Sequence, residues 1–336
     1  MTKSAFNFSV TRLIQIFALL LVCGLFAQAQ SKEDEVPPKK VKIGIFLISL
    51  YDFNTVDNTF RSDFWLWYVY PKSLKYKINP VKTREFINAK EFTSLNDYPE
   101  EKGELMWRTE KVRGVFNYNW DMSRFPFDKH ELKIVIEESL DDYDAFIYLP
   151  DRSGNSNIDN ILIEGWKVKG FSCSTEKKQY NTNFGDPEST IASSVYSRFI
   201  ASINIQRDSW LIFIKMSLGV YVAVLIAIIS LLMRSKSDDI FSGRVQVLVG
   251  TLFAAIINHQ IVNSMLGQKA NFTLMDSIHI ISYVVIFLGI LISLVTKRLS
   301  NFNKQHLAIV LDRVFSISLL ILYSFVNILL IYRAAH

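Results

Sequence analysis

The chain has 336 residues, of which half are hydrophobic and 13% are aromatic, and its net charge is +5. This composition excludes an intrinsically disordered chain, and two cysteines are too few for a small fold held together by disulfides. The small positive excess is compatible with nucleic-acid binding or with the basic flanks of membrane helices. Because the basic residues are dispersed along the chain, we expect no nucleic-acid partner.

The first 29 residues have the order of a secretory signal peptide. Two basic residues, Lys3 and Arg12, precede an apolar run over 13–26, which ends at Ala27-Gln28-Ala29. The alternative is an N-terminal membrane anchor, but the run is shorter than the roughly 20 residues that a membrane-spanning helix needs. Removal of residues 1–29 would place the new N-terminus outside the cytoplasm.

The charged, proline-containing segment 30–40 is typical of a flexible lead-in to a folded domain. After removal of the signal peptide, Cys173 is the only cysteine in the chain. We therefore expect Cys173 to be a free, partly buried thiol rather than a catalytic nucleophile.

Residues 41–209 show the two-residue alternation of apolar and polar side chains that is typical of β-strands. Leu132, Ile134 and Ile136, for example, alternate with more polar neighbours. The pattern predicts strands at 41–52, 59–70, 110–119, 145–149, 161–173 and 198–205. Many short strands separated by turns predict an immunoglobulin-like β-sandwich of about 170 residues.

Residues 210–336 have a different composition and are predicted to form a transmembrane domain of four helices. The expected spans are about 210–233, 245–266, 273–296 and 308–332. Most basic residues of this domain lie between spans one and two or near the connection of spans three and four: Arg234, Lys236, Arg244, Lys297, Arg298, Lys304 and Arg313. Because basic loops stay in the cytoplasm, both the β domain and the C-terminus are predicted to lie outside it.

The second predicted span carries a seam of side chains that recur about every 3.5 residues. The seam consists of Gln246, Gly250, Phe253, Ile257, Gln260 and Ser264. Its ends are polar or small and its middle is apolar, as expected of helices around a water-filled axis with a narrow apolar ring. The alternative is hydrogen bonding within an ordinary bundle. Asn258, His259 and Asn263 lie off the seam, and we expect them to bond neighbouring helices.

The segment 120–132 reads WDMSRFPFDKHEL. Its Phe125-Pro126-Phe127-Asp128 core resembles the Cys-loop signature of the pentameric ligand-gated ion channels, in particular the bacterial members that lack the two cysteines. Order and spacing agree over nearly all of the mature chain: Arg207 precedes span one, Arg244 opens span two and Thr273-Leu274-Met275-Asp276 opens span three.

The resemblance implies a homopentameric ligand-gated channel in the bacterial inner membrane, with membrane lipids around it. The second spans would line the pore, and the β domain and the C-terminus would be periplasmic. The agonist, a small molecule or a proton, is not named by the sequence. We expect no enzymatic activity and no cofactor, because the sequence has no nucleophile motif, metal-ligand set or phosphate loop.

The resemblance also implies how the two domains communicate. In the family the 125–128 loop presses on the connection between spans two and three, here 267–272, and its acidic residue lies near the basic residue that ends the last strand. The implied gating residues are Phe125, Pro126, Phe127, Asp128 and Arg207. The turn at 53–58 should touch the same region. The alternative for Asp128 is a simple turn cap.

A ligand would bind between adjacent subunits in a box of aromatic side chains, which attracts cations. The implied candidates are Trp65, Trp67, Trp107, Tyr143, Tyr180 and Phe184. The alternative for each tryptophan is the core of the sandwich. Ser139 stands at a position that is often aromatic in the family, and this argues against an amine ligand.

Two departures from the family motivate a second hypothesis, a non-conducting membrane receptor of the same architecture. Gly243 stands where cation-selective members carry Glu, and Phe253 replaces a smaller aliphatic side chain. A third departure is that span one lacks the proline usual in the family. Asp238 and Asp239, near the inner mouth, weakly favour cations, because rings of acidic side chains attract them.

Overall fold

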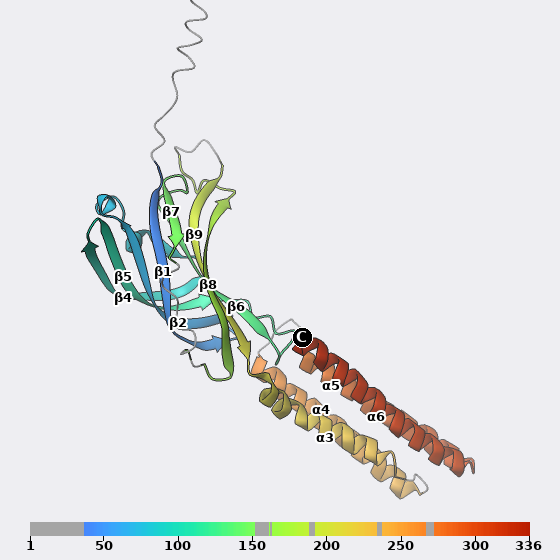
Figure 1. Cartoon of the computed structure of the whole chain (residues 1–336). Coiled ribbons are helices and arrows are strands. Elements are labelled where there is room, and N and C mark those ends of the chain that lie inside the picture. Colours follow the sequence, from blue (N-terminus) through green and yellow to red (C-terminus); the bar gives the residue numbers. More distant parts are fainter. Residues whose placement is uncertain (1–36, 152–160, 162, 188–191, 234–236, 267–271) are drawn as a thin grey trace, which may run out of the picture.

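The computed structural model describes residues 37–151, 161, 163–187, 192–233, 237–266 and 272–336. A β-sheet domain is followed by four long helices, which extend away from one end of the sheets (Figure 1). The predicted signal peptide, most of the lead-in 30–40 and most of the connection 267–272 lie outside the described residues.

Two sheets form the N-terminal domain. The strand order is β4-β5-β2-β1-β7 in the five-stranded sheet and β3-β6-β9-β8 in the four-stranded sheet. Neighbouring strands are antiparallel, except that β1 and β7 are parallel. The bounds are β1 Lys39–Asn54, β2 Thr59–Pro71, β3 Arg84–Phe86, β4 Ala89–Lys102, β5 Leu105–Asn117, β6 Lys129–Glu138, β7 Phe146–Pro150, β8 Trp166–Tyr180 and β9 Ser194–Arg207.

The two sheets pack face to face around an apolar core. Phe64 of β2 and Phe86 of β3 come from different sheets, and their ring centroids are 6.0 Å apart. Leu132, Ile134 and Ile136 of β6 are fully buried. The two-residue alternation predicted from the sequence therefore points these side chains into the core, as a strand requires.

Several strand boundaries differ from the sequence prediction. The predicted strand 161–173 starts at Trp166 and continues to Tyr180, because Gly165 adopts a positive φ of 76° in a preceding turn. Strand β4 was not predicted, since nearly all of its residues are exposed at the sheet edge and do not alternate. The short strand β3 and the one-turn helix α2 (Pro80–Thr83) were also missed.

The four helices are α3 Ser209–Ser230, α4 Asp238–Leu266, α5 Leu274–Asn301 and α6 Gln305–Ala335. All four are long and apolar enough to cross a membrane, as the sequence predicted. The C-terminus lies at the end of the bundle that is nearest the sheets (Figure 1). If the helices cross a membrane, the β domain and the C-terminus are therefore on the same side of it.

Candidate functional site

The loop between β5 and β6, residues 118–128, lies where the sheets meet the helices and is called the base loop below. Its Phe125–Pro126 peptide bond is cis. The backbone nitrogens of Phe125 and Phe127 donate to the carbonyl oxygens of Met122 and Arg124, at 2.9 and 2.8 Å. Phe125 and Phe127 are both buried. The loop is thus a compact turn that directs two aromatic side chains inward.

Asp128 is the last residue of the base loop, and its carboxylate accepts hydrogen bonds from Arg207 and His130. Arg207 donates from Nε to Oδ1 at 2.8 Å and from Nη2 to Oδ2 at 3.0 Å. The Nε2 of His130 donates to Oδ2 at 2.8 Å. Arg207 is the partner expected from the resemblance, whereas the role of this ion pair in gating stays a prediction.

Asp128 is only 1% exposed. Burial raises the pKa of its carboxyl group, but the hydrogen bonds from His130 and Arg207 outweigh burial and hold the pKa below its ordinary value of 3.8. Asp128 is therefore an ionised, buried side chain with three donors, and it is not a simple turn cap.

An aromatic cluster surrounds this ion pair. The guanidinium carbon of Arg207 lies 4.0 Å from the ring centroid of Trp166 and 5.0 Å from that of Phe125. The His130 ring packs edge-on against Trp120 at 4.9 Å, and Phe53 contacts both tryptophans. Sequence reasoning missed His130, Trp120 and Trp166, although Asp128 directly precedes β6 and the two-residue spacing of extended backbone places it on the same side as His130.

The base loop contacts two of the four helices. The Phe127 ring lies 5.1 Å from Trp210 and 5.6 Å from Phe213, both of α3. The backbone nitrogen of Leu274, the first residue of α5, donates to the carbonyl oxygen of Ser123 at 3.1 Å. Contacts of the loop, or of the turn 53–58, with residues 267–271 lie outside the described part of the chain and stay predictions.

Helix α4 presents its predicted seam to the outside of the chain. The six seam residues, Gln246, Gly250, Phe253, Ile257, Gln260 and Ser264, are all exposed. The opposite face is buried against the bundle, with Leu248, Thr251, Ala255 and Val262 pointing inward. Phe253 is 61% exposed and Ile257 is 60% exposed. Within a single chain, nothing in the described residues covers this stripe.

Polar side chains off the seam bond α4 to α5. His259 donates from Nε2 to Asp276 at 2.7 Å, and its Nδ1 lies 2.9 Å from the hydroxyl of Tyr283. The Nε2 of His279 donates to Asn258 at 2.9 Å. Asn258 and His259 therefore bond a neighbouring helix, as the sequence predicted, whereas a bond from Asn263 stays a prediction.

The far end of α4 is held by two ion pairs. Arg244 is completely buried and forms a two-pronged ion pair with Asp312 of α6, at 2.9 and 2.7 Å. Asp238 contacts Lys297 of α5 at 2.5 Å. This end lies away from the sheets (Figure 1).

The six expected ligand-binding residues fall into two groups on different sheets. Trp65 and Trp67 of β2 and Trp107 of β5 are half-buried and alternate with core residues, so they lie on the outer face of the five-stranded sheet. The alternative that they fill the core is therefore wrong. Trp67 packs over Gly44, where a Cβ would lie 2.3 Å from its ring, and it donates from Nε1 to Asp151 at 2.9 Å.

The second group belongs to the β8–β9 hairpin of the four-stranded sheet. The ring of Tyr180 lies 5.4 Å from Phe184 and 6.1 Å from Tyr196. The Tyr180 hydroxyl donates to Glu137 at 2.9 Å and accepts from Arg198 at 2.8 Å. Sequence reasoning missed Tyr196, Arg198 and Glu137.

Tyr143 lies on the same side of the domain, where its backbone nitrogen donates to the carbonyl oxygen of Val195 at 2.7 Å. The Lys177 ammonium lies 4.6 Å from the Tyr143 ring centroid. A cavity of about 750 Å³ opens beside this ring, and Lys39, Asp142 and Asp144 contribute to its lining. The three tryptophans and the Tyr180–Phe184 cluster therefore belong to different sheets of one chain.

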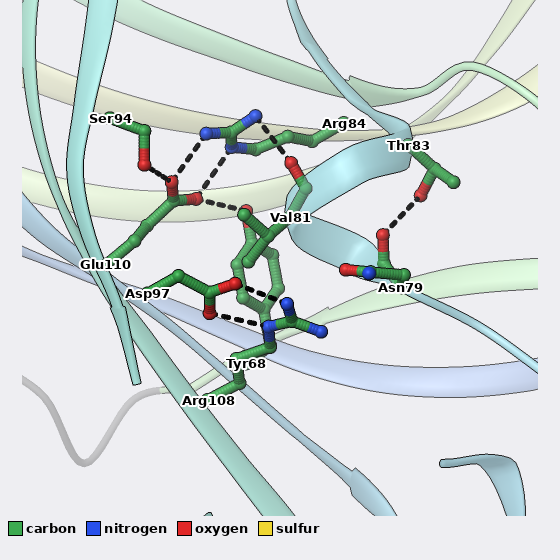
Figure 2. Close-up of polar contacts among 9 residues, drawn as sticks. All are labelled: Tyr68, Asn79, Val81, Thr83, Arg84, Ser94, Asp97, Arg108 and Glu110. Carbon is green, nitrogen blue, oxygen red and sulfur yellow. Dashed lines mark hydrogen bonds and ion pairs between the residues drawn. The ribbon is translucent and has the colours of Figure 1, made fainter. Parts of the chain in front are cut away.

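A buried ion pair joins the two sheets inside the domain (Figure 2). Arg84 of β3 donates to both carboxylate oxygens of Glu110 of β5, at 2.6 and 2.5 Å, and Glu110 also accepts from Ser94 and Tyr68. Burial raises the pKa of Tyr68 well above its ordinary value. Sequence reasoning missed this network, which links strands of the two sheets.

No protein-family model matches the sequence, and no curated protein matches it significantly. The described residues contain no group of three or more His, Cys, Asp or Glu side chains that could hold a metal ion. Function is therefore inferred from the geometry of these side chains together with the sequence resemblance.

Proposed function

We propose that the chain is one subunit of a homopentameric ligand-gated ion channel, with an immunoglobulin-like periplasmic domain and a pore in the bacterial inner membrane. The observation that carries this proposal is the exposure of all six seam residues on α4, while the opposite face packs against the bundle. Polar side chains exposed to lipid are costly. Around a shared axis they would face water instead.

The seam has the chemistry of a gated pore lining. Gln246 at one end and Gln260 and Ser264 at the other offer polar groups to water and ions. Between them, Phe253 and Ile257 would form apolar rings one helical turn apart. Five copies of each side chain would leave a narrow hydrophobic constriction, which stops ions by losing its water. Opening then requires the α4 helices to tilt or rotate away from the axis.

The base loop is the proposed mechanical link between ligand and pore. Its Asp128 is tied to Arg207, which ends β9 directly before α3, and its Phe127 packs on α3. Its Ser123 is bonded to the start of α5, and α5 is bonded to α4 through the His259–Asp276 contact. A displacement of the sheets would reach α4 through these contacts.

The two groups of expected ligand-binding residues support a site between subunits. The three tryptophans lie on one sheet and the Tyr180–Phe184 cluster lies on the other, so neighbouring copies in a ring would face each other with different groups. Aromatic faces attract cations, but Lys177 already lies over Tyr143 and Arg198 contacts Tyr180. The agonist, a small molecule or a proton, would be identified by screening small molecules and pH values for ion current.

The first experiment is to determine the mass of the detergent-solubilised full-length protein by native mass spectrometry. We expect five chains per particle. A stable monomer or dimer would remove the shared axis and with it the pore. A pentamer reconstituted into planar bilayers should then pass ion current in a screen of small molecules and pH values. A pentamer that binds a ligand but never conducts would instead indicate the non-conducting receptor.

A further inference from the structure

Arg244 is a basic residue near the inner end of the proposed pore-lining helix, yet it does not lie on the seam. It precedes the seam residue Gln246 by two positions, which is a rotation of about 200° around an α-helix. Arg244 therefore points to the side opposite the seam, and its side chain is 0% exposed. Its charge is directed into the bundle and away from the proposed pore.

Asp312 of α6 is the acidic partner of this buried cation. Arg244 donates from Nη1 to Oδ2 at 2.9 Å and from Nη2 to Oδ1 at 2.7 Å, so the guanidinium and carboxylate planes meet in the two-pronged arrangement that Arg favours. Nη1 also lies 3.3 Å from the carbonyl oxygen of Met233. A folded protein is strongly destabilised when a buried arginine loses its carboxylate partner. Asp312 is thus what permits Arg244 to stay inside.

The seam itself carries an acidic residue toward its inner end. Continued inward from Gln246 by steps of three and four residues, it passes through Gly243 and reaches Asp239, which is exposed. The neighbouring Asp238 is paired with Lys297 at 2.5 Å. Among the described residues of this stripe, the charge presented at the inner end is therefore the carboxylate of Asp239.

We propose that Asp312 is a specificity-determining residue of the channel, because it holds the Arg244 cation inside the helix bundle and neutralises it there. The inner end of the seam then presents carboxylate without a competing guanidinium, and cations are favoured over anions. The part of this inference that concerns ions rests on the proposed channel function. The part that concerns the position of Arg244 does not.

The decisive variant is Asp312→Asn, which removes the negative charge and leaves the arginine. We expect the cation-to-anion permeability ratio, obtained from reversal potentials in asymmetric KCl, to fall several-fold. Asp312→Glu should keep the wild-type ratio, because it preserves the charge. The double variant Arg244→Gln/Asp312→Asn should also keep it, because both charges are gone. An unchanged ratio in Asp312→Asn, or an equal fall in the double variant, would overturn the inference.

The double variant also decides the matter if Asp312→Asn fails to assemble, because it leaves no unpaired buried charge. A wild-type cation-to-anion permeability ratio in the double variant then supports the inference that the neutralised Arg244 does not affect ion selectivity. An altered ratio contradicts it.

A chemical measurement separates this inference from the channel proposal. Phenylglyoxal modifies accessible arginines, and peptide mass spectrometry reports which ones react. Arg244 should stay unmodified in the wild type, in Asp312→Glu and in the matched control Asp238→Asn, and it should react in Asp312→Asn. Equal reactivity in all four proteins would mean that Asp312 does not position Arg244. If the wild type passes no current, the channel proposal fails, while this labelling still decides the position of Arg244.

Discussion

The backbone nitrogen of Leu274 donates a hydrogen bond of 3.1 Å to the carbonyl oxygen of Ser123, and so joins the start of α5 to the base loop. Four residues further along the same loop, Phe127 packs against Trp210 at the start of α3. One short loop therefore contacts α3 and α5, and α4 packs against both of these helices. The buried Asp128–Arg207 pair anchors the end of the loop to β9.

Asp128→Asn should destabilise the β domain by about 3 kcal/mol, because it removes one partner of a buried ion pair and leaves Arg207 and His130 without their carboxylate. Tryptophan fluorescence of the full-length protein in detergent, followed in guanidinium chloride, measures the free energy of unfolding. The control is Glu131→Gln, since Glu131 is exposed and only 3.4 Å from Lys133, and it should cost less than about 1 kcal/mol. Equal effects would show that Asp128 is no anchor.

The stability that Asp128 contributes should depend on pH with a defined sign. Its pKa is lower in the folded state than its ordinary value of 3.8. The folded state therefore favours the ionised form, so the contribution is complete above pH 3.8 and is lost as the pH falls through the lower folded pKa. The difference in thermal midpoint between wild type and Asp128→Asn should be constant near neutral pH and shrink in acid. A difference that grows in acid would contradict this sign.

Phe253→Ala should increase ion flux through the reconstituted protein, because a smaller side chain widens and wets the proposed constriction. Leu248→Ala is the matched control, since Leu248 is fully buried on the opposite face of α4, against Gly289 of α5. The control should lower stability by roughly 2–5 kcal/mol through a cavity and leave the pore lining intact. Unchanged flux in an active preparation of Phe253→Ala would exclude Phe253 from the constriction.

Cys173 should react slowly with alkylating reagents in the folded protein. Burial raises the pKa of its thiol from an ordinary value of 9.0 to about 12. At a pH of about 8 the thiolate fraction is then roughly a thousandfold below that of an unperturbed thiol. Iodoacetamide labelling, read by peptide mass spectrometry before and after unfolding, measures the ratio. Fast labelling of the folded protein would mean that the thiol is accessible and not structural.

Glu110→Gln should destabilise the β domain by about 3 kcal/mol or more, because Arg84 would then be buried against a neutral side chain (Figure 2). Glu100→Gln is the control on the exposed strand β4, where Glu100 lies 3.4 Å from Lys102, and its effect should stay below about 1 kcal/mol. The free energies of unfolding of the two purified variants, measured in guanidinium chloride by tryptophan fluorescence, are compared with that of the wild type. A Glu110→Gln protein as stable as the control would show that the buried pair does not hold the sheets together.

The division into a β domain and four apolar helices, and much of the local structure, could be predicted from the sequence. Alternation of apolar and polar residues identified β1, β2 and β6, because a strand with one buried face must alternate. Long apolar runs with at most one charged residue identified four helices, because only such runs suit the interior of a membrane. The residues that form the 3.5-residue seam of α4 could also be predicted, because helical periodicity fixes which side chains share a face.

The contacts between side chains far apart in the sequence could not be predicted, because they depend on how whole elements pack. Strand β4 had no signal, because an exposed edge strand does not alternate. Nothing local indicated that Arg84 would meet Glu110, that His130 would join Asp128, or that Arg244 would be buried by Asp312, 68 residues away. A buried charge requires a partner, but sequence periodicity fixes only the face on which each residue lies. Packing of whole elements against one another selects the partner.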